Sequence, residues 1–298
     1  MSISCFMATR NCLIQGYPVL EAIQTALPIC DEFVIVDGYS SDRTYEAIKS
    51  IPDNRITLFQ DKWVETGKSA EPIRKAINKA REKVSGDYIF QVDANQIIPD
   101  ESAQVIKDLP RVFPEVTLFA LPFYQLMGKY VIDEEYRVKL ARNEKSVISI
   151  ADGWTLGTAL KSRKELRRLF STHTLLSVLS ALTGNVPLFK QSSTYLRYVY
   201  LPKPIFRYYS IEPQLFFNKL KERKKILSGD WEKVGISSKR VSEMLSVYEE
   251  TGDKDHFWNS LCQYYQDLQL SGHFVPKEIR EIRYISKSGH PRIVQERL

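Results

Sequence analysis

The first part of the chain alternates short apolar runs with amphipathic stretches. Residues 2–7 and 32–36 are β-branched or aromatic runs that predict strands, and residues 19–27 between them place apolar side chains on one helical stripe. This alternation predicts a mainly parallel sheet with helices on its faces. The elements predicted next are a helix that Ser41 or Asp42 caps and that ends at Ile48, a strand at 55–59, a helix at 71–84 and a strand at 87–92.

The pattern changes in the middle of the chain. Residues 116–150 hold shorter strand-like runs separated by turns. Beyond Lys161 the sequence becomes rich in Leu, Lys and Arg at helical spacing, interrupted by an aromatic, strand-like stretch at 195–201. We therefore predict a soft boundary near residue 160 and a polar, loosely ordered tail after Ser286.

Composition narrows the class of protein. Hydrophobic residues make up 43% and charged residues 26% of the 298 positions, which excludes disordered, collagen-like and disulfide-rich classes. Lys and Arg number 42 against 36 Asp and Glu, a net charge of +6. This modest excess favours anionic ligands such as nucleotides or phospholipid head groups, and we expect no nucleic-acid partner.

Membrane and export signals are absent from the sequence pattern. No window reaches the roughly 18 apolar residues of a membrane span, and the N-terminus lacks the charged and apolar regions of a secretory signal. The sequence predicts a cytoplasmic protein. Peripheral contact with the cytoplasmic membrane face is an alternative, which rests on basic runs at 161–168 and 219–225.

Cysteine and histidine do not indicate a metal centre. The histidines are scattered, and the cysteines lack metal-ligand spacing. We predict reduced, partly buried thiols at Cys5, Cys12, Cys30 and Cys262.

An acidic residue directly follows each of two predicted strands. Asp37 follows the run at 32–36, and Asp93 follows the run at 87–92. Ligands of an open α/β sheet bind beyond the carboxyl ends of its strands, which draws attention to both residues. Asp93 and Asn95 offer two oxygen ligands suited to a hard divalent cation that also holds phosphate. Two acids of these segments also have a local interpretation when taken singly. Asp42 fits a helix cap, and Asp93 fits a turn residue.

Several segments together resemble the family 2 glycosyltransferases, which have the nucleotide-sugar-binding GT-A fold. The likeness covers residues 1 to about 105 and is fairly specific, because its segments follow in the family's order. These segments are Asn11 with residues 21–27, residues 31–44 (DEFVIVDGYSSDRT), residues 76–80 with 86–95 (AINKA, then GDYIFQVDAN), and residues 99–101 (PDE).

The resemblance implies a metal-assisted, inverting transfer of a sugar from a UDP-, GDP- or dTDP-sugar to an acceptor hydroxyl. The acceptor class stays open between a carbohydrate, a lipid-linked carrier and a protein. Asp37 would accept hydrogen bonds from the base or ribose, and Asp93 with Asn95 would hold Mn²⁺ or Mg²⁺ against the diphosphate. On the nucleotide-sugar side the likeness implies Thr9, Asn11, Asp37, Ser40, Asp42, Lys68, Arg74, Asp93 and Arg207.

Some of these positions depart from the family. Asn95 stands where the family has a second Asp, which predicts weaker metal binding. Arg207 stands where one branch has a His, and its guanidinium suits a diphosphate. Lys68 and Arg74 also fit solvated surface charges.

The general base is predicted from a weaker likeness. Residues 136–143 resemble the family's "RLFRN" segment, and the acid that follows it would be Asp152. We take Asp152 as the first candidate for the base, with Asp133, Glu134 and Glu135 as competitors. Trp154 beside it suits stacking on a sugar ring, or simple packing.

The likeness also predicts different roles for the two parts of the chain. Residues 1–160 would form a GT-A nucleotide-sugar-binding and catalytic core, and residues 161–298 a mainly helical C-terminal region that completes the acceptor side. The departures at Asn95 and Arg207 keep open a non-catalytic nucleotide-sugar-binding protein. A nucleotidylyltransferase is less favoured, because residues 8–16 are not the Gly-rich basic loop that grips a triphosphate.

Overall fold

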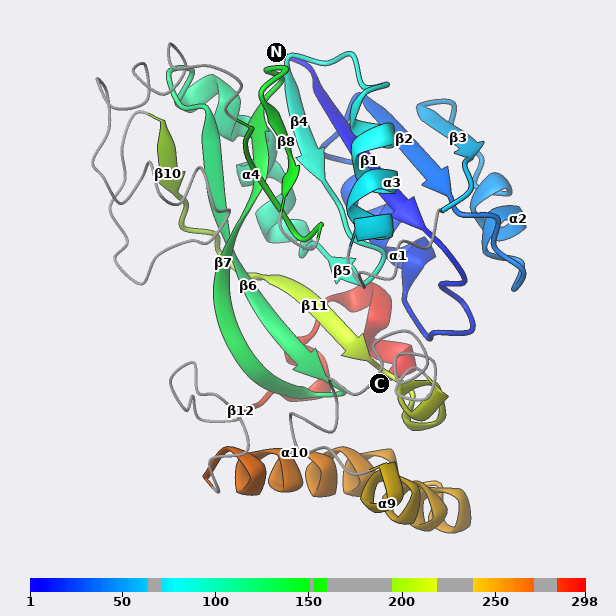
Figure 1. The fold of residues 1–298 in the computed structure, drawn as a ribbon. Helices are drawn as coiled ribbons and strands as arrows, with labels where there is room; N and C mark the ends of the chain where they lie inside the picture. The colour runs from blue at the N-terminus through cyan, green and yellow to red at the C-terminus, as the bar shows by residue number, and fades with distance from the viewer. Residues whose placement is uncertain (64–70, 151–152, 160–194, 219–237, 271–282) are drawn as a thin grey trace.

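The computed structural model describes residues 1–63, 71–150, 153–159, 195–218, 238–270 and 283–298 (Figure 1). Four strands near the N-terminus are parallel neighbours in the order β3, β2, β1 and β4. Their bounds are β1 Ile3–Thr9, β2 Glu32–Asp37, β3 Ile56–Gln60 and β4 Tyr88–Gln91. The mixed α/β class predicted from the alternation is confirmed.

Helices cover both faces of this parallel part. Successive residues of a strand point to opposite faces, so Cys5 and Met7 of β1 enter one core while Phe6 enters the other. Helices α1 and α4 pack in the first core, and α3 packs in the second (Figure 1). The helix bounds are α1 Val19–Ala26, α2 Thr44–Lys49, α3 Glu71–Arg81 and α4 Asp100–Val112.

The middle of the chain forms a long hairpin rather than the shorter strands that the pattern predicted. Strands β6 (Leu118–Met127) and β7 (Tyr130–Arg142) pair antiparallel along their length, and β7 also pairs with β4. The sequence pattern failed here because residues 133–137 are polar or charged and do not look like a strand. Their backbone is nevertheless paired, since β7 and β6 are in register across this stretch.

Further short segments add strands to the same sheet. β10 (Leu196–Tyr198) and β11 (Ile205–Ser210) run parallel to β6, β5 (Gln96–Ile97) runs antiparallel to β11, and β12 (Arg283–Tyr284) pairs with β7. A separate small sheet joins β8 (Val147–Ile150) and β9 (Thr155–Thr158). The boundary near residue 160 stays a prediction, although segments on both sides of it contribute to one sheet.

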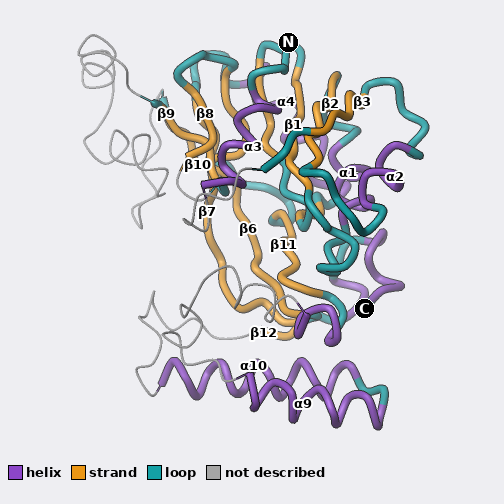
Figure 2. The backbone as a smooth tube through the Cα atoms, turned by 45° about the vertical axis from the view of Figure 1, so that its right-hand side comes forward, coloured by secondary structure: helices purple, strands orange, loops and turns teal. Residues whose placement is uncertain are grey.

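A pair of helices lies across the end of the long hairpin. α9 (Ser238–Thr251) and α10 (Lys254–Leu270) run side by side below the β6–β7 turn (Figures 1 and 2). Phe257, Trp258 and Leu261 of α10 form a buried cluster with Met127 of β6. Gly128 in the turn has a φ of 52° and lies against Trp258, where a Cβ atom would overlap the indole ring.

The C-terminal segment is packed against the sheet, so the prediction of a loosely ordered tail was wrong. It contains two 3₁₀ helices, η1 (Lys287–Gly289) and η2 (Arg292–Arg297). His290 and Val294 are buried, and the Tyr208 hydroxyl of β11 lies 2.8 Å from His290 Nδ1. Arg297 Nη1 lies 2.8 Å from a carboxylate oxygen of Glu21 in α1. These contacts are all with residues distant in sequence, which a reading of local polarity does not reveal.

The four cysteines are free and buried, as predicted. Within the described ranges, none of the helices combines the length and the apolar character that crossing a membrane requires. The basic runs at 161–168 and 219–225 lie outside the described residues.

Candidate active site

Two clusters of polar side chains form where the parallel strands end. The first, which we call the loop network, consists of Thr9, Asn11, Asp37, Ser40 and Asp42 between the ends of β1 and β2. The second, which we call the charged recess, lies beyond the end of β4. Its lining residues are Asp93, Gln96, Phe123, Glu135, Arg137, Lys139, Trp154 and Arg207.

In the loop network, the Asp37 carboxylate is held by neutral donors. Ser40 donates through its backbone N–H at 2.8 Å and its hydroxyl at 2.5 Å, and Thr9 Oγ1 donates at 3.1 Å. The Asp37 residue has no exposed surface. These contacts give Asp37 a structural role, and its predicted hydrogen bond to a base or ribose stays a prediction.

Asn11 and Asp42 join the two loops of this network. Asn11 has a φ of 51°, and its Oδ1 accepts from the backbone N–H of Ser41 at 2.8 Å. Asp42 Oδ2 accepts from the N–H of Ile14 at 2.8 Å, and Asp42 Oδ1 from the N–H of Thr44 at 3.1 Å. The residue that directly precedes α2 is Arg43, in a left-handed conformation, so neither Ser41 nor Asp42 is the N-cap that the sequence predicted.

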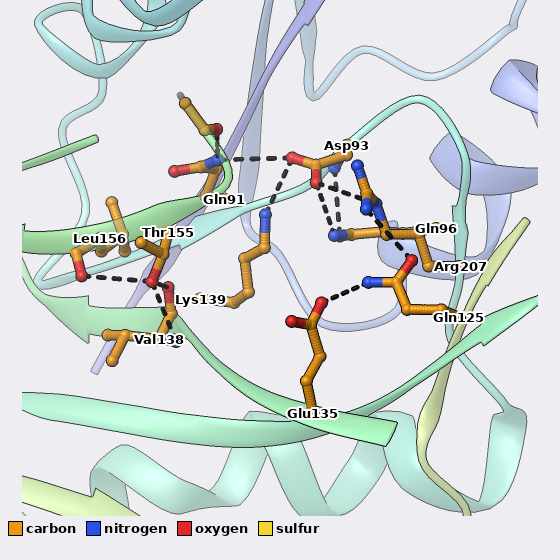
Figure 3. A network of polar contacts seen from close by, with 11 residues as sticks. Gln91, Asp93, Gln96, Gln125, Glu135, Val138, Lys139, Thr155, Leu156 and Arg207 are labelled. Atoms are coloured by element: carbon orange, nitrogen blue, oxygen red, sulfur yellow. Dashed lines mark hydrogen bonds and ion pairs between the residues drawn. The ribbon is translucent and has the colours of Figure 1, made fainter. Parts of the chain in front are cut away.

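The charged recess centres on the Asp93 carboxylate (Figure 3). Asp93 Oδ1 accepts from Lys139 Nζ at 2.8 Å and from Gln91 Nε2 at 3.3 Å, while Oδ2 accepts from Gln96 Nε2 at 2.7 Å. Arg207 Nε lies 3.9 Å from Oδ2. Asp93 therefore differs from Asp37 in having cationic partners.

Lys139 is a fully buried lysine in the middle of β7. Burial lowers the pKa of its ammonium group to about 8, against the opposing effect of Asp93. The group stays mainly protonated at neutral pH. Its position follows from the pairing of β7 with β4, which brings Leu140 opposite Phe90 near the end of β4.

A polar chain connects β7 to β11 across β6. Arg207 Nη1 donates to Gln125 Oε1 at 3.1 Å, and Gln125 Nε2 donates in turn to Glu135 Oε1. Arg137 forms an ion pair with the other oxygen of Glu135. Burial by itself raises the pKa of Glu135, but the nearby Arg137, Arg207 and Gln125 bring it below its usual value. Glu135 is therefore ionised at neutral pH.

Trp154 forms one wall of the recess. The Arg207 guanidinium carbon lies 4.2 Å from the centre of its ring, and that of Arg137 lies 5.5 Å away. The adjacent Thr155 Oγ1 accepts from the backbone N–H of Val138 in β7 at 3.2 Å, and Gly153 O accepts from Gln91 at 2.5 Å. Hydrogen bonds on both sides therefore hold Trp154 in place.

Two buried polar atoms beside Asp93 have no hydrogen-bond partner. They are Arg207 Nε, a donor, and Gln91 Oε1, an acceptor. Buried polar groups are nearly always paired in folded proteins, so such atoms at a recess indicate a place where a ligand completes the hydrogen bonding.

The Asp93 carboxylate is already paired with a cationic side chain, because Lys139 Nζ donates to it at 2.8 Å. Asn95 Nδ2 donates to the carbonyl oxygen of Tyr208 at 2.9 Å, which ties this side chain to β11. The ammonium group of Lys139 beside Asp93 does not fit a divalent cation at the same carboxylate. In the part of the chain that the structure describes, no group of three or more His, Cys, Asp or Glu side chains is placed to hold a metal ion.

The structure separates the candidate bases. Glu135 lies in the recess, whereas Glu134 forms an ion pair with Arg283, with both side chains nearly half exposed. Asp133 Oδ1 accepts from the N–H of Glu134 and does not line the recess. Arg74 lies on α3 and does not line it either. Asp152 and Lys68 lie outside the described residues.

Residue-level reasoning missed Lys139, Gln91, Gln96, Gln125 and Arg137. One signal was available, because Glu135, Arg137 and Lys139 follow one another at every second position and so lie on one face of a strand. Three charges on one strand face, next to an apolar stretch, indicate a charged pocket. The glutamines carry no comparable signal.

Comparisons with known proteins leave the family open. No protein-family model matches the sequence, and no curated protein matches it significantly. Among solved structures, S. aureus TarS residues 1–349 are similar with 13% identity and a TM-score of 0.41, over 90% of this chain and 83% of that one. A longer TarS structure gives 15% identity and a TM-score of 0.42, over 94% of this chain and only 50% of that one.

A third structure is glucosyl-3-phosphoglycerate synthase from Mycobacterium tuberculosis in complex with Mn²⁺, UDP and phosphoglyceric acid. It is 17% identical with a TM-score of 0.29, over 42% of this chain and 43% of that one. Likenesses at this level carry no argument about the chemistry of this chain.

Proposed function

We propose that this chain is a glycosyltransferase that moves a sugar from a nucleoside-diphosphate sugar to an acceptor hydroxyl. The observation that carries the proposal is the charged recess, where Lys139 and Arg207 meet at Asp93 beside Trp154. Cations at the carboxyl end of parallel strands suit a diphosphate, and an aromatic wall suits a sugar ring.

The loop network supports the nucleoside side of the proposal. It lies at the ends of β1 and β2, next to β4 in the same parallel sheet, at the edge where ligands of such sheets bind. A UDP-, GDP- or dTDP-sugar would place its nucleoside near Thr9, Asn11, Asp37, Ser40 and Asp42, in line with the sequence resemblance. The acceptor is a carbohydrate, a lipid-linked carrier or a protein.

In the proposed reaction the bond between the anomeric carbon and the β-phosphate oxygen breaks, and its electron pair stays on that oxygen. The acceptor oxygen bonds to the opposite face of the anomeric carbon, which inverts its configuration. The acceptor proton passes to a carboxylate, for which Asp152 stays the candidate, because both oxygens of Glu135 are bound by Gln125 and Arg137. Arg207 and Lys139 stabilise the negative charge that develops on the departing diphosphate.

The Mn²⁺ or Mg²⁺ that the resemblance implies is not part of this proposal, because the Asp93 carboxylate is already paired with the Lys139 ammonium group. Asp93 instead positions Lys139 and, through Gln96 and Gln91, the turn after β4.

The test is thermal unfolding with UDP-, GDP- and dTDP-sugars, since a ligand that binds only the folded state raises the unfolding temperature. We expect one nucleotide class to stabilise the protein. Release of the matching nucleoside diphosphate with an acceptor panel then reports turnover. Binding without any turnover would favour a non-catalytic nucleotide-sugar-binding protein, and no binding at all would refute the proposal.

A further inference from the structure

We infer that Lys139 occupies the place at Asp93 that a divalent cation would take, and that Lys139 and Arg207 together bind the donor diphosphate without a metal ion. The inference rests on the proposed function, because it assigns the group that receives the diphosphate. It departs from the metal-assisted reaction that the sequence resemblance implies.

The carboxylates of the recess already accept hydrogen bonds from protein donors. Asp93 Oδ1 accepts from Lys139 and Oδ2 accepts from Gln96. The two oxygens of Glu135 are bound by Gln125 and Arg137. Metal ions such as Mg²⁺ and Mn²⁺ prefer oxygen ligands, and here a cation would compete with these protein donors for the carboxylate oxygens.

The recess carries a net positive charge. Among its described lining residues, the carboxylates of Asp93 and Glu135 face the cations of Lys139, Arg137 and Arg207. The cations exceed the carboxylates before any metal is added. A divalent cation on Asp93 would stand beside the Lys139 ammonium, whose side chain is only 1% exposed, so that little solvent would screen the two charges. Repulsion between poorly screened charges of like sign disfavours that state.

Arg207 presents an unpartnered donor to the recess. Arg207 is nine-tenths buried, and its Nε lies 3.9 Å from Asp93 Oδ2 without a hydrogen-bond partner. Its Nη1 is fixed on Gln125, and its guanidinium is stacked on Trp154. A preorganised guanidinium with a free donor suits an anionic oxygen, and a diphosphate would supply one.

The experiment measures binding of UDP, GDP and dTDP to the full chain by calorimetry, in EDTA and again with Mn²⁺. We expect one of these nucleotides to bind in EDTA, with a Kd within about threefold of that in Mn²⁺. Lys139→Met should weaken binding in EDTA by about 10- to 100-fold. In the Met variant Mn²⁺ should restore binding, because Asp93 is then free to hold a cation.

Lys129→Met is the matched control. Lys129 is also a largely buried lysine, with 12% side-chain exposure, and it forms an ion pair with Asp255 at 2.8 Å. It lies in the β6–β7 turn and not in the recess. This variant should bind nucleotide as the wild type does. Circular dichroism checks that each variant is folded, and electron paramagnetic resonance of Mn²⁺ should detect tighter metal binding by Lys139→Met than by the wild type.

The outcomes separate the inference from the proposed function. Nucleotide binding that needs Mn²⁺ in the wild type would overturn the inference and leave the glycosyltransferase proposal intact. This measurement requires no variant, so it decides the question even where Lys139→Met does not fold. Unchanged binding in EDTA by a folded Lys139→Met would also overturn the inference. No binding of any nucleotide in either condition would refute both.

Discussion

The loop network and the charged recess each contain an aspartate at the end of a parallel strand, but the two carboxylates have opposite surroundings. Asp37 ends β2, is fully buried, and accepts from the hydroxyls of Thr9 and Ser40. Asp93 follows β4, has 15% of its side chain exposed, and contacts Lys139 and Arg207. One aspartate stabilises a turn, and the other organises cations.

The difference shows that position at a strand end does not by itself define a functional residue. The donors to Asp37 come from the end of β1 and from the loop after β2, so the hydrogen bonds of Asp37 are satisfied within the protein. The recess draws on β4, β5, β6, β7 and β11, and leaves Arg207 Nε without a partner. An unsatisfied donor and an excess of cations suit the recess to an anionic group, whereas the Asp37 carboxylate is satisfied within the loop network.

The largest effect is expected for Arg207→Gln. Loss of the preorganised guanidinium should lower kcat by about 10²- to 10³-fold, the range found when one donor to a developing oxyanion is removed. The measurement is release of nucleoside diphosphate under saturating donor. Arg111→Gln, which changes an exposed arginine of α4, is the control. A loss below threefold on Arg207→Gln would mean that the recess does not stabilise the leaving group.

A substitution in the loop network should lower stability rather than kcat. Asp37→Asn places an amide opposite the Ser40 and Thr9 donors, and hydrogen bonds to a charged group contribute about 1.5–3 kcal/mol each. We expect the free energy of unfolding in urea to fall by about 2–3 kcal/mol. Asp108→Asn, at an exposed ion pair with Arg111, should change it by less than about 0.5 kcal/mol. Equal effects of both substitutions would contradict the structural role of Asp37.

The stability of the protein should also depend on the C-terminal segment, where His290 is hydrogen-bonded to Tyr208 next to Arg207. Burial lowers the pKa of His290 to about 4, with Lys129 acting in the same direction. The unfolded chain therefore binds a proton on this group at higher pH than the folded chain does. Stability should fall as the pH drops from about 6.5 towards 4, by about 2 kcal/mol between pH 7 and pH 5.

Urea unfolding of the wild type and of His290→Gln at the two pH values measures this contribution. The variant should lose less stability on acidification, since glutamine keeps polar contacts and does not titrate in this range. An identical pH dependence of both proteins would show that His290 is not buried in its neutral form.

The smallest effect is expected for Trp154→Ala. A cation–π contact of this kind contributes about 0.5–1 kcal/mol, so loss of the ring should weaken nucleotide-sugar binding about two- to fivefold. Trp154→Phe keeps an aromatic face and should retain most of the affinity. If the sugar itself stacks on Trp154, binding of the sugar nucleotide should fall more than binding of the free nucleoside diphosphate.

The parallel half of the fold was predictable because its signals are local. The strand at 32–36 and the helix at 19–27 agree with β2 and α1 to within a residue at each end. The long β6–β7 hairpin was not predictable, since residues 133–137 have the polarity of a loop and gain their strand conformation from pairing with β6. α4 was not predicted either, although Asp100 and Glu101 in its first turn suit a helix start.

The candidate site, like the fold, was predictable only in part. The sequence pointed to Asp93 and Arg207, and the structure brings them together with Glu135. It also pointed to Asp37, Ser40 and Asp42, whose roles toward a nucleotide stay predictions. Lys139 was missed, and although its alternation with Glu135 and Arg137 indicates a charged strand face, it does not reveal which carboxylate Lys139 meets.

The sequence by itself determined the alternation of strands and helices, and therefore the edge of the sheet where acidic residues gather. Only the tertiary structure decided which charges meet there. Lys139 is 46 positions from Asp93, and Arg207 is 82 positions from Gln125. Their pairing depends on strand order and register, since β7 lies directly beside β4 and β11 beside β6. Periodicity is a property of neighbours along the chain, whereas the charge of a site is set by neighbours in space.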